Sequence, residues 1–149
     1  MMEIKKFLLP CDGSLHSINA AHYTLNFAKI FGAHVTIVNC FEWKASILEL
    51  PSPLIVPSPL ITDQESTSKR NAEDILKTAG EIFADQGIEY QLKTIYGSPS
   101  RVLANLAKHK EYDLIIMGSH GHSNIASLFI GSVTHQVLNT IYCPVLIVP

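Results

Sequence analysis

Charge, aromatic side chains and clustered basic residues are all scarce in this sequence. Charged residues make up 16% of the 149 positions and aromatic residues 8%, and the formal net charge is −2. The 11 lysines and arginines are scattered along the chain, whereas a protein that binds the phosphate backbone needs them on one face. We therefore expect no nucleic-acid partner.

Long apolar runs are absent as well. No run approaches the ~20 residues that span a bilayer. Acidic Glu3 stands near the start of the sequence, ahead of only a short apolar stretch, which is unlike a signal peptide. These features predict a cytoplasmic protein without a membrane partner.

Cysteine is limited to Cys11, Cys40 and Cys143, which are widely spaced among apolar residues. An odd number at such spacing predicts reduced thiols and no disulfide framework. Packing is the role we expect for them, because a reactive thiol needs a lowered pKa and no lysine or arginine is adjacent. Cys40 is the best candidate for the alternative, a redox-sensitive thiol near a cleft.

The sequence does contain enough apolar material for one folded domain. Its hydrophobic fraction is 47%, and a chain of this length buries roughly 70% of the surface that its unfolded form exposes. Without a linker, a repeat or a low-complexity tract, residues 1–149 are predicted to form a single domain.

Five segments have the pattern of strands. Four are short and apolar on both faces, as strands buried between two layers are: 7–9, 35–38, 114–117 and 145–148. The fifth, residues 88–94, alternates apolar and polar side chains. It is predicted to lie at an edge of the sheet, with one face in water.

Between these strands, apolar residues recur at the spacing of helices. The predicted helices are 14–31, 62–86, 98–107 and 132–138. A capping box at Thr62 and Glu65 predicts the start of the second helix. Before it, the prolines from Pro51 to Pro59 interrupt both the helical and the strand periodicity of apolar residues. They predict a long surface loop over residues 42–61. Three roles stay open for this loop: a surface that docks a partner, a lid, or a connection with no role in binding.

The alternation of strands and helices predicts an α/β fold. We expect a single open, mostly parallel five-stranded sheet with helices on both faces, joined by right-handed crossovers. Ligands of such sheets bind at the carboxyl ends of the strands, where the strand order reverses. Two loops follow such ends: one holds Asp12, and the other begins with the glycines after Met117.

The glycine-rich stretch is the most informative motif in the chain. Gly118-Ser119-His120-Gly121 is followed, after nine residues, by Gly131-Ser132-Val133-Thr134. Glycine allows positive φ and a close approach of backbone N–H groups to an anion. A serine at the start of a helix adds a hydroxyl and the positive end of the helix dipole. The stretch therefore favours phosphate binding.

A simpler interpretation of the same residues stays open. Gly118 and Gly121 would then only turn the chain after a strand, and Ser132 would only cap a helix. The spacing matches neither a Walker loop nor the compact dinucleotide fingerprint. The motif alone does not choose between the two interpretations.

Four blocks of the sequence resemble the ATP-binding branch of the universal stress protein family, and the resemblance extends over the whole chain. The blocks are Leu8–Ser14, Tyr112–Gly121, Gly131–Val133 and Cys143–Val148. The resemblance implies a Rossmann-like sheet, related to the adenine nucleotide alpha hydrolases, with strand order 3-2-1-4-5. It also implies an ATP ligand.

The resemblance assigns roles to individual residues. Pro10 and Asp12 would lie near the adenosine, Met117 would line the base or ribose pocket, and Cys40 would stand against the adenine. The remaining residues that the resemblance implies would hold the triphosphate: Gly118, Gly121, Gly131, Ser132, Val133 and Thr134.

Two positions depart from the family's pattern. Asn39-Cys40 stands where His-Val is more usual, which leaves the choice between adenine and guanine open. The family often has a basic residue in the glycine loop, where this chain has His120 and His122. Imidazoles carry charge at mildly acidic pH.

Asp12 and the histidines also have alternative roles. Asp12 is either a nucleotide ligand or only a turn former, since Asp before Gly is common after a strand. His120, His122 and His135 have no cysteine or carboxylate at ligand spacing, so we expect no metal site made by protein alone. Mg²⁺ held mostly by ATP phosphates is expected.

The leading functional hypothesis is an ATP-binding regulatory stress-response protein whose nucleotide state and dimer are read by a protein partner. The second is a slow ATPase or self-phosphorylating enzyme with Ser119 or Ser132 as acceptor. No catalytic residue is predicted, because the glycine loop has no lysine to act as the cation that phosphoryl transfer needs. The third is a nucleotide-free dimeric interaction protein.

The final strand predicts a homodimer. Val145 to Val148 carry no charge, and an apolar strand at the edge of a sheet invites pairing with another chain. A twofold-symmetric dimer pairs this strand antiparallel with its own copy. The family resemblance implies the same contact.

Overall fold

Five parallel strands form one sheet at the centre of the protein. We describe a computed structural model, which covers residues 3–43, 58–109, 111–122, 129–140 and 142–149. In these residues the strands are β1 (Lys6–Pro10), β2 (His34–Phe41), β3 (Tyr90–Tyr96), β4 (Leu114–Gly118) and β5 (Val145–Val148).

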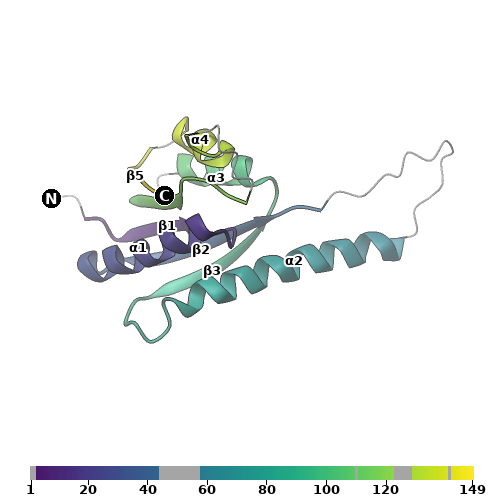
Figure 1. Ribbon diagram of the computed structural model, residues 1–149, viewed down its shortest axis with the longest axis horizontal. Helices are drawn as coiled ribbons and strands as arrows, with labels where there is room; N and C mark the ends of the chain where they lie inside the picture. Colours follow the sequence, from purple (N-terminus) through teal and green to yellow (C-terminus); the bar gives the residue numbers. More distant parts are fainter. Residues whose placement is uncertain (1–2, 44–57, 110, 123–128, 141) are drawn as a thin grey trace.

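The order of the strands is β3-β2-β1-β4-β5, and every neighbouring pair is parallel. Figure 1 shows β3 and β5 at the two edges. The predicted α/β class and strand order are confirmed. On β3, Gln91 and Lys93 are exposed, as the alternating pattern of that segment predicts. Leu92 is exposed as well, so this apolar position does not face the core as the pattern predicts.

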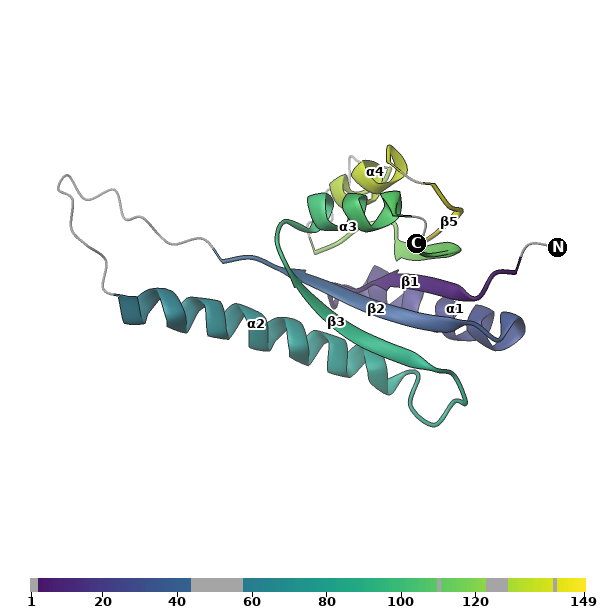
Figure 2. The same ribbon diagram turned by 180° about the vertical axis from the view of Figure 1, so that it is seen from behind.

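Helices cover both faces of the sheet, α1 and α2 on one face and α3 and α4 on the other (Figure 2). They are α1 (Leu15–Phe31), α2 (Ser58–Glu81), α3 (Pro99–Lys108) and α4 (Ser132–Leu138). Among the described residues, no helix combines the length and the apolar character needed to cross a membrane.

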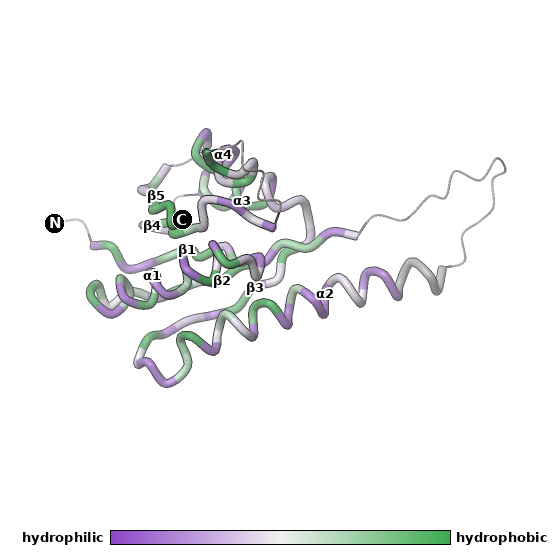
Figure 3. Tube along the Cα trace, in the orientation of Figure 1, coloured by the Kyte–Doolittle hydropathy of each residue, from purple (hydrophilic) through white to green (hydrophobic). Residues whose placement is uncertain are grey.

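Alternate residues of β1 point to opposite layers, which gives the protein two apolar clusters. Phe7 and Leu9 pack with residues of α1 and α2 that include Leu76. Leu8 packs on the other side with Leu103 of α3 and with residues of α4. Figure 3 shows apolar and polar residues mixed along α2, as expected for a helix with one face against the sheet and the other in water.

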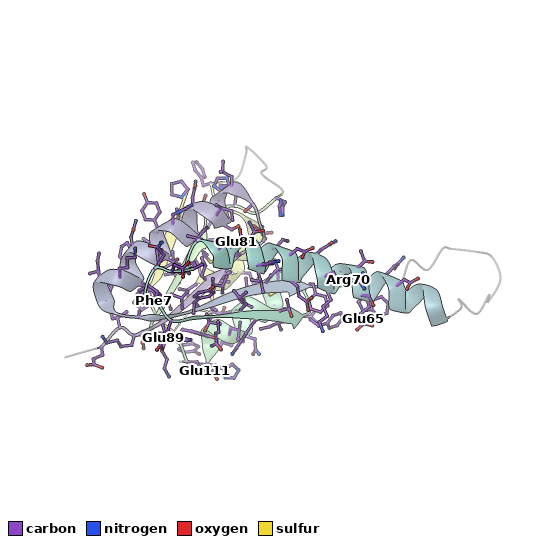
Figure 4. All side chains as sticks on the ribbon, turned by 90° about the horizontal axis from the view of Figure 1, so that it is seen from below. Phe7, Glu65, Arg70, Glu81, Glu89 and Glu111 are labelled. Atoms are coloured by element: carbon purple, nitrogen blue, oxygen red, sulfur yellow. The ribbon has the colours of Figure 1, made fainter. Side chains whose placement is uncertain are left out.

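The second helix begins earlier than its sequence pattern predicts. α2 starts at Ser58. The prediction that the helix begins at the capping box of Thr62 is therefore wrong, and so is the prediction that the loop extends to residue 61. Pro59 is compatible with helix because the first turn has no intrahelical acceptor for its missing N–H. Residues 44–57 of that loop lie outside the described residues. The first half of α2 extends beyond the strands, where Figure 4 labels Glu65 and Arg70.

Candidate functional site

A cavity of about 570 Å³ opens at the carboxyl ends of the strands. It lies where the order reverses, because β2 and β3 are on one side of β1 and β4 and β5 are on the other. Every residue assigned to the ligand from the sequence lines this cavity: Pro10, Asp12, Cys40, Met117, Gly118, His120, Gly121, His122, Gly131, Ser132, Val133 and Thr134.

Helix α2 supplies a wall of the cavity that sequence reasoning missed. Ser68, Asn71, Ala72 and Ile75 line it, at the i, i+3, i+4, i+7 spacing of one helical face. This spacing could have identified the face. The sequence pattern assigned the apolar members of the helix to the core alone. The other cavity residues missed from the sequence are Cys11, Ser17, Val38, Asn39, Phe41, Glu42, Pro99 and Leu103.

The glycines of the loop after β4 are required for close packing. None of Gly118, Gly121 and Gly131 has positive φ, so these positions need glycine for its small size and not for a left-handed backbone. A Cβ on Gly118 would lie 2.8 Å from the backbone carbonyl carbon of His16, at the start of α1. The Gly118 carbonyl oxygen accepts a hydrogen bond from Thr134 Oγ1 (3.0 Å). Gly118 therefore brings α1 and α4 together at the end of β4.

Asp12 and the glycine loop face each other across the cavity. A Cβ on Gly121 would lie 2.7 Å from Asp12 Oδ2. The other carboxylate oxygen accepts a hydrogen bond from Ser14 N (2.9 Å), which is the turn-forming role of aspartate. His122 Nε2 donates to the Asp12 carbonyl oxygen (2.5 Å). Asp12 is thus a turn former and a cavity residue at once.

The first turn of α4 completes this side of the cavity. Gly131 occupies the N-cap position, and the structure shows no side-chain capping bond, so Ser132 is the first helical residue and not the cap. Gly131 N donates to Ser119 O (2.7 Å), which closes the loop on itself. The N–H groups of Ser132 and Val133 belong to the turn that has no intrahelical acceptors. These groups suit an anionic ligand.

Ser119 and His120 of the glycine loop meet His16 of α1. Ser119 Oγ lies 3.4 Å from His16 Nδ1 and 3.0 Å from His120 Nδ1. The two imidazole rings are 5.4 Å apart between centroids. The described part of the chain contains no group of three or more His, Cys, Asp or Glu side chains arranged to hold a metal ion.

The thiols of the cavity are poorly suited to reaction. Burial raises the pKa of the Cys40 thiol to about 12, and burial is also the main cause that raises the pKa of Cys11. Both thiols stay protonated near neutral pH, whereas the thiolate is the reactive species. These pKa shifts support the packing role that the sequence predicts for Cys40.

The strand order, the two crossover layers and the cavity at the switch point define the chain as a Rossmann-like α/β protein with a ligand cavity. A model of the universal stress protein family matches residues 3–149, and the chain belongs to that family. The resemblance seen in the four sequence blocks is confirmed.

Relatives of known sequence match almost the whole chain. The universal stress protein YxiE of Bacillus subtilis is 34% identical, over 96% of this chain and 97% of its own length. A universal stress protein of Thermus aquaticus is 31% identical, over 97% and 98%.

Solved structures share the fold. UspA of Lactobacillus plantarum has a TM-score of 0.82 at 21% identity, with all of both chains covered. A universal stress protein solved in complex with cAMP has a TM-score of 0.70 at 24% identity and covers 99% of each chain. The protein of Archaeoglobus fulgidus in complex with dAMP has a TM-score of 0.64 at 18% identity, over 99% of this chain and 100% of its own.

Proposed function

We propose that this protein binds an adenine nucleotide, ATP in the first place, and that its nucleotide state is read by a protein partner in a stress response. One observation carries the proposal: Asp12, the glycine loop and the first turn of α4 line a single cavity. The two relatives solved with cAMP and with dAMP support an adenine nucleotide as the ligand class.

Within the cavity, the ligand would run from β2 to α4. The adenosine would lie by Pro10, Asp12 and Cys40, and the phosphates would lie by the first-turn N–H groups of α4 and the Ser132 hydroxyl. Mg²⁺ would be held mostly by the phosphates, since the described residues contain no protein cluster for a metal ion.

The lining of the cavity favours binding over phosphoryl transfer. Neither a lysine nor an arginine is among the described residues that line it, and phosphoryl transfer relies on a cation near the transferred group. A turnover assay separates this proposal from a slow ATPase.

The proposed binding has a direct test in the melting temperature of the purified protein. ATP with Mg²⁺ at 100 times its dissociation constant adds about 2.7 kcal/mol to the free energy of unfolding, and a domain of this size should then melt several degrees higher. Mass spectrometry of ligand extracted from protein purified without added nucleotide identifies what the cavity holds. No thermal shift at millimolar ATP would contradict the proposal.

We also propose a homodimer through β5. Ile115 N donates to Pro144 O (3.0 Å) and Ser119 N donates to Val148 O (2.7 Å). In a parallel pair, alternate residues of a strand bond to its neighbour. The N–H and C=O groups of Val145 and Ile147 therefore point to the open edge, where a second β5 in antiparallel orientation would bond to them.

A further inference from the structure

A second cavity, of about 390 Å³, adjoins the first between the end of β2 and α2. The described residues that line it are Glu42, Trp43, Asp63, Gln64, Thr67 and Ser68. Glu42 and Ser68 also line the larger cavity, so the two cavities are neighbours. The α2 residues belong to the half of the helix that extends beyond the strands (Figure 4). This second cavity therefore lies outside the packed core, where a partner can reach it.

Two carboxylates in the second cavity have no counter-ion. Glu42 and Asp63 are exposed, and neither forms an ion pair with another described residue. The described residues of the lining include no lysine, arginine or histidine. A cavity lined by charges of one sign concentrates ions of the opposite sign. The second cavity should therefore attract a cation.

Trp43 gives the same cavity an aromatic surface. Its side chain is partly buried, and tryptophan is the side chain that attracts a cation most strongly to the face of its ring. Hard metal ions take oxygen ligands, and an indole offers none, so an organic cation suits this lining better than a metal ion does. A guanidinium uses both kinds of surface, because its flat face stacks on an aromatic ring and its N–H groups donate to carboxylates.

We propose that the second cavity binds the guanidinium group of an arginine in a partner protein. The inference deepens the proposed function and rests on it for the purpose of the contact, because it names the chemistry of the partner that reads the nucleotide state. Glu42 and Ser68, which line both cavities, would place the partner's arginine beside the nucleotide.

A free arginine is the other source of a guanidinium, and the lining disfavours it. Its own carboxylate would be repelled by Glu42 and Asp63, and it would find no cationic side chain among the described lining residues. An arginine within a polypeptide does not carry that carboxylate. The charge of the cavity therefore favours a protein as the partner.

The test titrates the nucleotide-free protein with the blocked tripeptide acetyl-Gly-Arg-Gly-amide at constant ionic strength. Trp43 is the only tryptophan in the chain, so a change in its fluorescence reports this cavity, and calorimetry measures the same binding independently. The citrulline tripeptide has a neutral group of nearly the same shape and should bind about five- to a hundredfold more weakly, because it loses the cation–π contact and both ion pairs. The lysine tripeptide and free arginine should also bind more weakly.

Each of these comparisons can overturn the inference. Equal binding of the arginine and citrulline tripeptides, or no binding of the arginine tripeptide by either method, overturns it altogether. A lysine tripeptide that binds as tightly overturns the choice of a guanidinium. Free arginine that binds as tightly overturns the choice of a protein partner.

Variants then assign the binding to the two carboxylates. Glu42→Gln and Asp63→Asn each remove one charge with little change of shape, and each should weaken the arginine tripeptide about two- to fivefold. Both side chains are exposed, so the variants should fold. Glu65→Gln is the matched control, because Glu65 lies on the same half of α2 (Figure 4) but is not among the residues that line the cavity. It should keep the wild-type affinity, and an equal loss in all three variants overturns the inference.

The melting temperature with ATP, measured on the same preparations, separates this inference from the proposed function. A thermal shift with ATP and no preference for the arginine tripeptide overturns the inference and leaves the nucleotide site standing. A preference for the arginine tripeptide without a thermal shift supports the arginine site and contradicts the proposed nucleotide binding.

Discussion

The role assigned to Ser132 depends on the residue at which α4 begins. A serine before a helix is most often a cap. Here Gly131 is the N-cap, and Ser132 makes no capping bond. Ser132 lines the cavity, and we propose that its hydroxyl binds the ligand.

Replacing Ser132 with alanine should therefore weaken ATP more than AMP, because the hydroxyl is proposed to serve the outer phosphates. Loss of one hydrogen bond to a charged group costs about 1.5–3 kcal/mol of binding free energy. Calorimetric titration with both nucleotides measures the difference. Ser68→Ala, on the α2 wall of the same cavity, is the control that should not discriminate between them. An equal loss for ATP and AMP would show that Ser132 does not contact the outer phosphates.

Cys40 gives a second prediction at this scale, on reactivity and pH. Its pKa of about 12 in the folded protein, against 9.0 for an ordinary thiol, means that less thiolate is present at any pH. Alkylation by iodoacetamide at pH 8 should be at least about tenfold slower in the folded than in the urea-unfolded protein. Peptide mass spectrometry locates the label, and fast alkylation of folded Cys40 contradicts the packing role.

The same shift has a consequence for stability. A pKa raised on folding favours the native state while the thiol is protonated in both states. From about pH 9 the unfolded chain loses its proton first, so this contribution declines as the pH rises towards 12. Cys40→Ala should make the alkaline decline in the free energy of unfolding shallower than in wild type. A parallel decline in both proteins would exclude Cys40 as its cause.

At the scale of elements, the loop after β4 connects three parts of the protein through its glycines. Gly118 touches the backbone of α1, Gly121 meets the side chain of Asp12, and Gly131 lies against His120 and Ser119. The first and third contacts involve backbone, which cannot move aside. The second involves the end of a side chain, which can.

These contacts predict different effects for two alanine substitutions. Gly118→Ala should lower the free energy of unfolding by about 1–3 kcal/mol, as overpacking does, because its Cβ would lie 2.8 Å from His16 backbone. Gly121→Ala should cost less stability but displace the Asp12 carboxylate, so its main effect should be weaker ATP binding. Urea unfolding and calorimetric titration measure the two quantities. Equal loss of stability in both variants would contradict this division of roles.

At the scale of the whole molecule, the sheet has two edges of different character. β3 carries exposed Gln91 and Lys93, and lysine on an edge discourages pairing. β5 consists of Val145, Leu146, Ile147 and Val148, without a charge. The proposed dimer uses the second edge.

Ile147→Pro should convert the dimer to a monomer. The substitution removes an N–H that points to the open edge and leaves the pairing of β5 with β4 intact. Sedimentation velocity at tens of micromolar measures the change. Ile147→Ala, which keeps the N–H, is the control and should remain dimeric. A wild-type protein that sediments as a monomer contradicts the proposed dimer.

Several features follow from the sequence by itself, because they depend on local periodicity and turn chemistry. The apolar runs at β1, β2, β4 and β5 mark strands in any context, and Ser14 and Gly32 bound α1 as cap residues do. The spacing of Gly118, Gly121 and Gly131 placed the candidate site in the loop where the cavity lies. The strand order came from the family resemblance, since no local pattern encodes it.

Only the tertiary structure decided the rest. Pro59 appeared to exclude helix, but its position in the first turn of α2 is harmless. The α2 wall of the cavity exists because the crossover sets that helix against β2 and β3, a contact between segments far apart in sequence. The orientation of Asn39 depends on the Cys11 carbonyl oxygen, 28 residues away. Periodicity reports which residues share a face of one element, whereas a binding site depends on which faces meet.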